Sequence, residues 1–174
     1  VIAERLGLDL PQPDMTSWTA MVNRVKHPSA GTAKIAVVGK YTDHIDSYKS
    51  IQESLIHGGI ANDVKADIHW LSSEVFDNGE GVEKLKEYDG LLIPGGFGPR
   101  GVEGMLETIR WARENQMPFF GICLGLQCAV IEFARNVCGL EGSHSSEFAE
   151  ASPDPVICLL DSQLQVTTMG GTMR

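Results

Sequence analysis

The sequence predicts an α/β protein with a doubly wound, mostly parallel β-sheet. Short apolar segments alternate along the chain with segments whose apolar residues recur at helical spacing. Such alternation is typical of right-handed βαβ units, which pack helices on the faces of a parallel sheet. Two glycine-rich turns directly follow apolar segments. Because parallel sheets bind ligands at the carboxyl ends of their strands, the functional site is expected there.

The expected elements follow one another in a regular order. Apolar runs typical of buried strands lie at residues 34–38, 64–71, 90–93, 118–122 and 156–160. Helical spacing is found over residues 47–57, 81–88, 102–115 and 124–137. Gly58-Gly59 is expected to end the first of these helices. The chain stops at Arg174 within the pattern, so the fold is expected to be truncated at its C-terminus.

Residues 1–33 differ from this pattern and are expected to form an interdomain linker with a short helix. Residues 6–13 are punctuated by proline and are expected to be extended. Asp14 is placed to cap a short amphipathic helix that ends before Pro28. Residues 34–174 are then expected to form one domain, which is incomplete at its C-terminal end.

The composition narrows the class of function. The net charge of -9 argues against binding to nucleic-acid phosphates and against adhesion to anionic membranes. No apolar run approaches the roughly 20 residues that span a bilayer. The cysteines are expected to be reduced thiols of a cytoplasmic protein. Their spacing does not fit zinc ligands, so no metal site is expected; they are Cys123, Cys128, Cys138 and Cys158.

The strongest functional signal is Gly121-Ile122-Cys123-Leu124-Gly125, which joins an expected strand to an expected helix. A nucleophile at the centre of such a turn forms a nucleophile elbow, in which glycines avoid clashes at strained backbone angles. The macrodipole and free N–H groups of the following helix favour the thiolate, which is the attacking species in acyl transfer. Cys123 is therefore predicted to be a nucleophile. The alternative is a small residue packed at a tight βα turn.

A second glycine-rich turn, Pro94-Gly95-Gly96-Phe97-Gly98, follows the expected strand at residues 90–93. Beside an elbow, such a loop supplies half of an oxyanion hole, and the N–H group of Leu124 supplies the other half. Taken alone, this segment is better read as a plain turn. Phosphate binding is disfavoured because the spacings of the Walker loop and of GxGxxG are absent.

Together these turns, with Leu126-Gln127 after the second, resemble the class I (triad) glutamine amidotransferases, which have a flavodoxin-like fold. More specific strings are similar to the CTP synthase family within that class. They occupy residues 35–41, 46–48, 100–105, 132–137, 145–148 and 169–174. The resemblance covers almost the whole chain, including the linker around Trp18. It implies a ligase: the glutamine-hydrolysing part of a CTP synthase.

The resemblance implies a role for particular positions. Cys123 would attack the side-chain amide of L-glutamine, giving a glutamyl thioester and ammonia. Gly96 and Leu124 would donate N–H groups to the oxyanion. Gln127 and Glu147 would hold the substrate glutamine, and a carboxylate suits its α-ammonium group.

The resemblance also implies partners and nucleotides. Ammonia would pass to the protein's own N-terminal synthetase domain, where ATP and Mg²⁺ support amination of UTP to CTP in pyrimidine nucleotide biosynthesis. No cofactor is expected in the present domain. GTP would act as an allosteric activator through a loop that contains Arg100 and Glu103, whose other reading is a solvated loop pair. A homotetramer assembled through the synthetase domain is implied.

The proton-handling half of a triad is not found in this sequence. A cysteine nucleophile needs a general base, usually a histidine oriented by a carboxylate, and the family carries this pair on a His-x-Glu motif. That motif is expected beyond Arg174, because no histidine here has its context; the histidines are His27, His44, His57, His69 and His144. No Walker-type loop or acidic metal pair is present for synthetase chemistry, so the chain is expected to be a fragment.

Two other functions fit an elbow cysteine. A DJ-1-like cysteine α/β protein shares the fold and the elbow, but it is not expected to carry the strings similar to CTP synthase. A non-catalytic interaction module would keep Cys123 without a base. A His-x-Glu motif in the sequence after Arg174 would favour the enzyme over the module.

Overall fold

The main sheet has four strands in the order β2-β1-β3-β4, and every neighbouring pair is parallel. The structure is a computed structural model that describes residues 2–160. The strands are β1 (Thr32–Gly39), β2 (Lys65–Ser72), β3 (Gly90–Ile93) and β4 (Phe119–Gly121). The register brings Ile93 opposite Gly121 at the carboxyl ends of β3 and β4. The predicted α/β fold with a parallel sheet is therefore confirmed.

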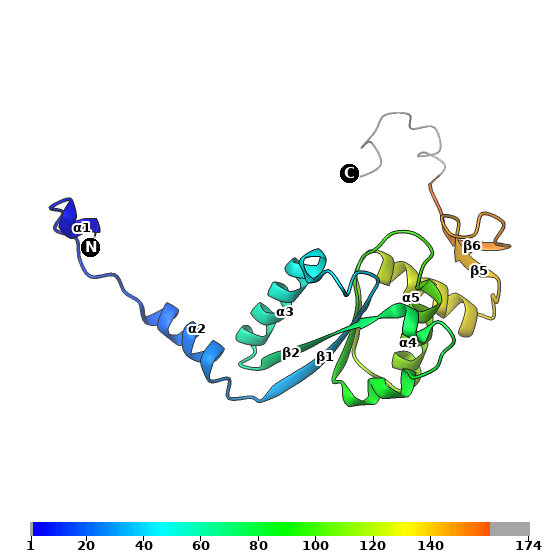
Figure 1. The fold of residues 1–174 in the computed structure, drawn as a ribbon, viewed down its shortest axis with the longest axis horizontal. Coiled ribbons are helices and arrows are strands. Elements are labelled where there is room, and N and C mark those ends of the chain that lie inside the picture. The colour runs from blue at the N-terminus through cyan, green and yellow to red at the C-terminus, as the bar shows by residue number, and fades with distance from the viewer. Residues whose placement is uncertain (1, 161–174) are drawn as a thin grey trace.

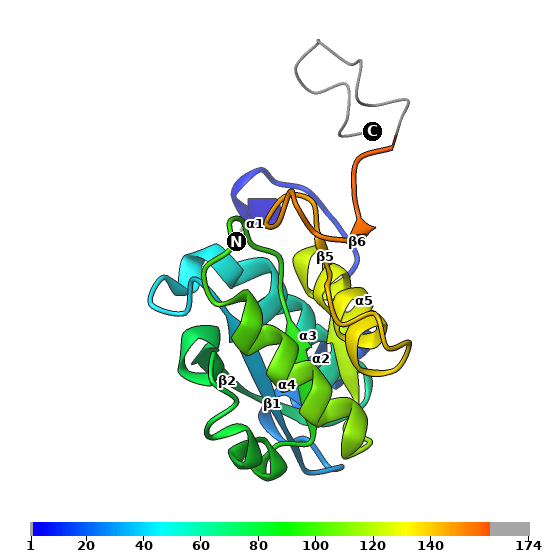
Figure 2. The ribbon, with the colours of Figure 1, turned by 90° about the vertical axis from the view of Figure 1, so that its right-hand side faces the viewer.

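Helices cover both faces of this sheet, as a doubly wound fold requires. Figures 1 and 2 show α3 (Lys49–Ala61) on one face, and α4 (Val102–Glu114) with α5 (Leu124–Asn136) on the other. Because β1 and β3 end in residues buried from both sides, their sequences read as continuous apolar runs. The core between the sheet, α4 and α5 includes Ala36, Val38, Leu91, Ile93, Met105, Ile109, Leu124 and Ile131.

The residues before β1 extend away from the sheet (Figure 1). They contain α1 (Ile2–Arg5) and α2 (Thr16–Lys26), and neither helix has a buried residue. The N-cap position of α2 is Met15 and not Asp14, one residue later than expected. The Asp14 carboxylate still accepts from the N–H group of Thr16, the first residue of the helix, at 2.9 Å. The short helix is confirmed, whereas the role of residues 1–33 as an interdomain linker stays a prediction.

The helix that follows β1 is longer than the sequence pattern predicts. Gly58-Gly59 was expected to end it, but α3 runs on to Ala61. A Cβ atom on Gly59 would lie 2.6 Å from the carbonyl oxygen of Val64. This glycine therefore lets the start of β2 approach α3 closely, and it does not act as a helix terminator. Short 3₁₀ helices complete this half of the chain: η1 (Ile45–Tyr48), η2 (Ser73–Phe76) and η3 (Val82–Glu87).

The predicted strand at residues 156–160 is wrong in extent and in pairing. The structure has a strand β6 at Asp154–Ile157, which pairs with β5 (Ser143–Ser145) in a separate two-stranded sheet. β5 was not predicted because Ser-His-Ser carries no apolar run. The small sheet packs against α5, the helix that begins immediately after Cys123.

A partly buried ion pair joins α4 to α5. The Glu132 carboxylate is 1% exposed and accepts from Nε of Arg113 at 3.1 Å and from Nη2 at 2.8 Å. Nδ2 of Asn136 donates to the same carboxylate at 3.1 Å. Removing one partner of such a pair leaves the other buried without compensation, which is costly.

We predict that Arg113→Ala lowers the free energy of unfolding by about 3 kcal/mol, because Glu132 would stay buried and unpaired. Arg110→Ala is the matched control: Arg110 pairs with Glu114 on the exposed surface of the same helix, and its loss should cost less than about 0.5 kcal/mol. Urea unfolding followed by circular dichroism measures both values. Equal effects from the two substitutions would contradict the importance of the Glu132 contact.

Candidate functional site

Cys123 lies at a tight connection between β4 and α5, and its backbone is strained. Its φ of 54° places a residue with a side chain in the region that favours glycine, which costs about 1–3 kcal/mol. Neighbouring contacts hold it there. The N–H group of Ile122 donates to the carbonyl oxygen of Ile93 at 2.9 Å, and the N–H group of Gln127 donates to the carbonyl oxygen of Cys123 at 3.1 Å.

The two glycines that flank Cys123 are required by close backbone contacts. A Cβ atom on Gly121 would lie 2.6 Å from the carbonyl carbon and oxygen of Gly125. A Cβ atom on Gly125 would lie 2.1 Å from the carbonyl oxygen of Ile93. The G-x-Cys-x-G spacing therefore has the steric cause that the elbow motif implies.

The Cys123 side chain is exposed at the N-terminus of α5, where free N–H groups and the helix dipole favour an anion. Cys128, one turn further along the same helix, is fully buried. Burial raises the pKa of the Cys128 thiol to about 12. The helix thus carries one accessible thiol at its start and one inert thiol inside the core.

The loop between β3 and α4 lies against the elbow. We call residues 94–99 the glycine loop. A Cβ atom on Gly95 would lie 3.5 Å from Cβ of Cys123, and one on Gly96 would lie 3.3 Å from Cδ2 of Leu124. Within residues 2–160, neither the N–H group of Gly96 nor that of Leu124 donates a hydrogen bond. Both expected oxyanion donors are thus close to the thiol and available to a ligand.

A hollow of about 400 Å³ opens in front of Cys123, within the size range of small-molecule sites, roughly 300–1,000 Å³. Tyr41, which lies two residues after β1, forms one wall with residues of η1 and α3. The glycine loop and the elbow form the other wall. The lining residues are Tyr41, Ser47, Tyr48, Ile51, Gly95, Gly96, Phe97 and Cys123. Sequence reasoning gave no role to Tyr41 or Tyr48. The available signal was their place just after the carboxyl end of an expected strand.

Gln127 and Glu147 lie on different elements, and neither is among the residues that line the hollow in front of Cys123. Gln127 is partly buried in the first turn of α5, and Glu147 is exposed in the turn that follows β5. The neighbour of Glu147 in that turn, Phe148, lies with its ring centroid 5.7 Å from Nζ of Lys40. In the described part of the chain, neither the Gln127 nor the Glu147 side chain forms a hydrogen bond. Their role in holding glutamine stays a prediction.

Arg100 and Glu103 do not pair with each other. Arg100 forms an ion pair with Glu74, and its Nη2 donates to the carbonyl oxygen of Lys40 at 3.0 Å. Glu103 lies in the first turn of α4 and pairs with Nη1 of Arg135 at 3.0 Å. The expectation of one loop carrying both residues is therefore wrong for Glu103, which is helical.

The histidine nearest Glu147 in sequence, His144, is not among the residues that line the hollow in front of Cys123. Nδ1 of His144 accepts from the N–H group of Ser145 at 2.8 Å, and its Nε2 lies 3.7 Å from the Glu103 carboxylate. Partial burial, followed by the charge of Arg135, lowers the pKa of His144. Both ring nitrogens are thus directed at residues outside the hollow in front of Cys123.

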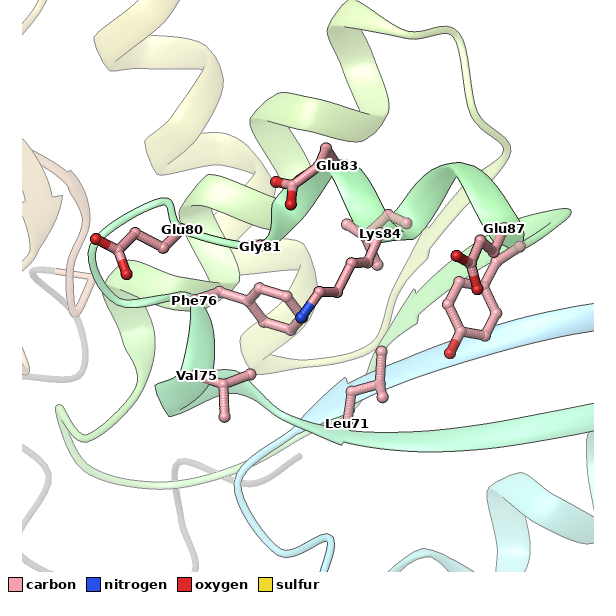
Figure 3. A pocket seen from close by; sticks show the side chains of 10 residues that line it. Leu71, Val75, Phe76, Glu80, Gly81, Glu83, Lys84 and Glu87 are labelled. Atoms are coloured by element: carbon pink, nitrogen blue, oxygen red, sulfur yellow. The ribbon is translucent and has the colours of Figure 1, made fainter.

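A larger hollow, of about 670 Å³, lies elsewhere, between β2, η2 and η3. Figure 3 shows the Lys84 side chain crossing it beside Phe76, with Glu80, Glu83 and Glu87 around the rim. It shares no residue with the hollow at Cys123. Among residues 2–160 there is no group of three potential metal ligands. The same residues include no helix with the length and apolar character needed to cross a bilayer.

Comparison with known proteins adds a family to this geometry. The model of the family "Glutamine amidotransferase class-I" matches residues 43–174. The CTP synthase of Ruminiclostridium cellulolyticum is 53% identical over all of this chain, which covers 32% of that relative. The CTP synthase of Acidobacterium capsulatum is 52% identical over 97% of this chain and 31% of its own length. The chain thus spans about a third of the length of these curated relatives.

A solved structure agrees with these matches. The glutaminase domain of Trypanosoma brucei CTPS, with bound acivicin, superposes with a TM-score of 0.72 and 39% sequence identity. The match covers 75% of this chain and 51% of that one.

We predict that Gly125→Ala destabilises the protein by about 3 kcal/mol and slows alkylation of Cys123, because the added methyl group meets the Ile93 carbonyl and must displace the elbow. Gly58→Ala is the control. It adds the same methyl group inside α3, where no atom lies within 4 Å, and it should stabilise the helix by about 0.5–1 kcal/mol. Urea unfolding and iodoacetamide kinetics measure the two effects. A Gly125→Ala variant that matches the parent in both would refute the steric requirement.

We also predict that iodoacetamide at pH 8 modifies Cys123, Cys138 and Cys158 in the native protein, since all three are exposed. Cys128 should react only after unfolding, because it is buried and its thiol is almost fully protonated at that pH. Peptide mass spectrometry with and without urea checks this. Fast native labelling of Cys128 would contradict the packing of α5.

Proposed function

Since the chain belongs to the class-I glutamine amidotransferase family, we propose that it hydrolyses the side-chain amide of L-glutamine to glutamate and ammonia, with Cys123 as nucleophile. The observation that carries the proposal is the exposed thiol on a strained elbow beside the glycine loop. In the part of the chain that the structure describes, the N–H group of Gly96 in this loop donates no hydrogen bond. An elbow thiol beside two unpaired N–H groups suits attack on an amide carbonyl.

The reaction divides into two acyl transfers at Cys123. The thiolate attacks the amide carbon, and the carbonyl oxygen takes the negative charge beside the N–H groups of Gly96 and Leu124. Collapse breaks the C–N bond, and the leaving group takes a proton to depart as ammonia. Water then cleaves the glutamyl thioester, releasing glutamate and restoring the thiol. The base that moves these protons is proposed to be the His-x-Glu pair of the family.

The substrate is proposed to be held at its α-amino acid end by Glu147 and Gln127. The exposed Glu147 carboxylate suits an α-ammonium group, and the Gln127 amide suits either α-substituent. Strand β5, which ends two residues before Glu147, packs against α5, the helix that begins directly after Cys123 and carries Gln127. A glutamine bridging these residues would place its side-chain amide in the hollow in front of the thiol.

A further activity, the use of the released ammonia by a longer protein, is proposed from the relatives. In a longer protein like the CTP synthases that this chain matches, the ammonia would aminate UTP on a synthetase domain that uses ATP and Mg²⁺, with residues 1–33 as the connection. Tetramer formation would belong to that domain. Activation by GTP through Arg100 and Glu103 would require rearrangement, because Arg100 is paired with Glu74 and a triphosphate would have to replace that carboxylate.

We predict that Cys123→Ala lowers the rate of glutamine hydrolysis by the complete protein by more than about a thousandfold, because no other group can form the thioester. Cys138→Ala removes an equally exposed thiol and should leave the rate unchanged. A glutamine-analogue electrophile should label Cys123, and excess L-glutamine should protect it. Ammonia release and peptide mass spectrometry are the measurements. Full hydrolysis by Cys123→Ala would refute the proposed function.

A further inference from the structure

Lys40 is a buried cation that the proposed mechanism does not use. It directly follows the last residue of β1, and only 5% of its surface is exposed. Burying an ammonium group is costly unless its donors find acceptors. Nζ of Lys40 donates to the carbonyl oxygen of Phe97 at 3.2 Å and also to that of Gly98. Two carbonyl groups of the glycine loop therefore offset the free-energy cost of burying the Lys40 ammonium group.

Other contacts join the same two segments. The N–H group of Phe97 donates to the Tyr41 hydroxyl at 3.3 Å, so the peptide groups on both sides of Phe97 are bonded to the end of β1. The N–H group of Lys40 in turn donates to the buried Tyr48 hydroxyl at 3.2 Å. The bond to Tyr48 thus fixes the segment that follows β1, and this segment can support the glycine loop.

Gly96 lies directly between this support and the elbow. A Cβ atom on Gly96 would be 3.2 Å from Cδ of Lys40 and 3.3 Å from Cδ2 of Leu124. The Lys40 stem therefore sets one side of the slot that holds Gly96, while its ammonium group fixes the next two carbonyl groups. The loop itself contributes little rigidity, since Gly95, Gly96 and Gly98 all lack the side chains that restrict φ and ψ.

We propose that Lys40 is a positioning residue, which holds the Phe97 and Gly98 carbonyl groups so that the N–H group of Gly96 points at the oxyanion formed on Cys123. The inference rests on the proposed glutamine hydrolysis. Oxyanion donors act only when they lie about 2.7–3.1 Å from the developing charge. Without Lys40, the glycine loop could move. The N–H group of Gly96 would then leave the oxyanion, while the Cys123 thiol kept its position.

The test compares two reactions of Cys123 in the complete protein. Hydrolysis of glutamine passes through an oxyanion, whereas alkylation by iodoacetamide displaces iodide at a saturated carbon and forms none. In Lys40→Met, which keeps the apolar stem, kcat and kcat/KM for glutamine should fall together by about 10- to 100-fold. The rate of Cys123 alkylation, followed by peptide mass spectrometry, should stay within about twofold of the parent.

Two further variants complete the design. Lys49→Met is the control, because Lys49 is exposed and pairs with Glu53 along α3; both reactions should keep the parent rates. Lys40→Gln keeps one short donor and should lose less hydrolysis than Lys40→Met. The glycine loop lies at the surface, with Phe97 and Pro99 exposed, so both Lys40 variants are expected to fold. If Lys40→Met does not fold, the rates of glutamine hydrolysis and Cys123 alkylation in Lys40→Gln test the proposal instead.

The remaining outcomes overturn the inference. An unchanged kcat in the Lys40 variants would mean that the glycine loop keeps its conformation without Lys40. A rise in KM at constant kcat would mean that Lys40 binds the substrate. A parallel fall in alkylation would mean that Lys40 acts on the thiol or on folding. Failure of the proposed function looks different, because the parent protein would then release no ammonia from glutamine, or Cys123→Ala would still release it.

Discussion

At Gly125 the backbone of α5 approaches the carbonyl oxygen of Ile93 so closely that a Cβ atom would lie 2.1 Å from it. This contact fixes the start of α5 against the end of β3, directly beside Cys123 and its strained φ of 54°. The glycine loop leaves the same strand end only one residue later. A single close packing contact therefore sets the distance between the thiol and the N–H groups that face it.

Much of the fold could be predicted because its signals are local. β1 and β3 are buried on both faces and read as apolar runs, and the elbow is a five-residue motif with its own steric cause. The predictions were wrong where tertiary contacts, and not the local sequence, determine the structure. Gly59 serves the approach of β2 to α3, which helical spacing cannot show. β6 pairs with a Ser-His-Ser segment whose partner no periodicity identifies.

The residues of the site also fall into two groups: those that a local motif predicts, and those that only tertiary contacts reveal. Cys123, Gly96 and Leu124 belong to motifs whose spacing determines their geometry, so the sequence could bring them together. Lys40 lies in the string at residues 35–41, but no motif assigns it a role. It reaches residues 57 and 58 positions away, and a lone lysine after a strand is read by default as a solvated charge. Only the burial and the bonded carbonyl groups reveal that it supports the glycine loop.

The supports of the site also differ in kind. The elbow is held by close backbone packing at its two glycines together with backbone hydrogen bonds. The glycine loop is held by hydrogen bonds to the side chains of Lys40 and Tyr41. Steric constraints suit the nucleophile, whose position must be the same in both acyl transfers. Hydrogen bonds can break and re-form, so they suit a donor that must admit glutamine before it stabilises the oxyanion. Arg100, which directly follows the glycine loop, donates to the Lys40 carbonyl group. A ligand that drew Arg100 away would therefore act on the oxyanion donor through Lys40, without touching Cys123.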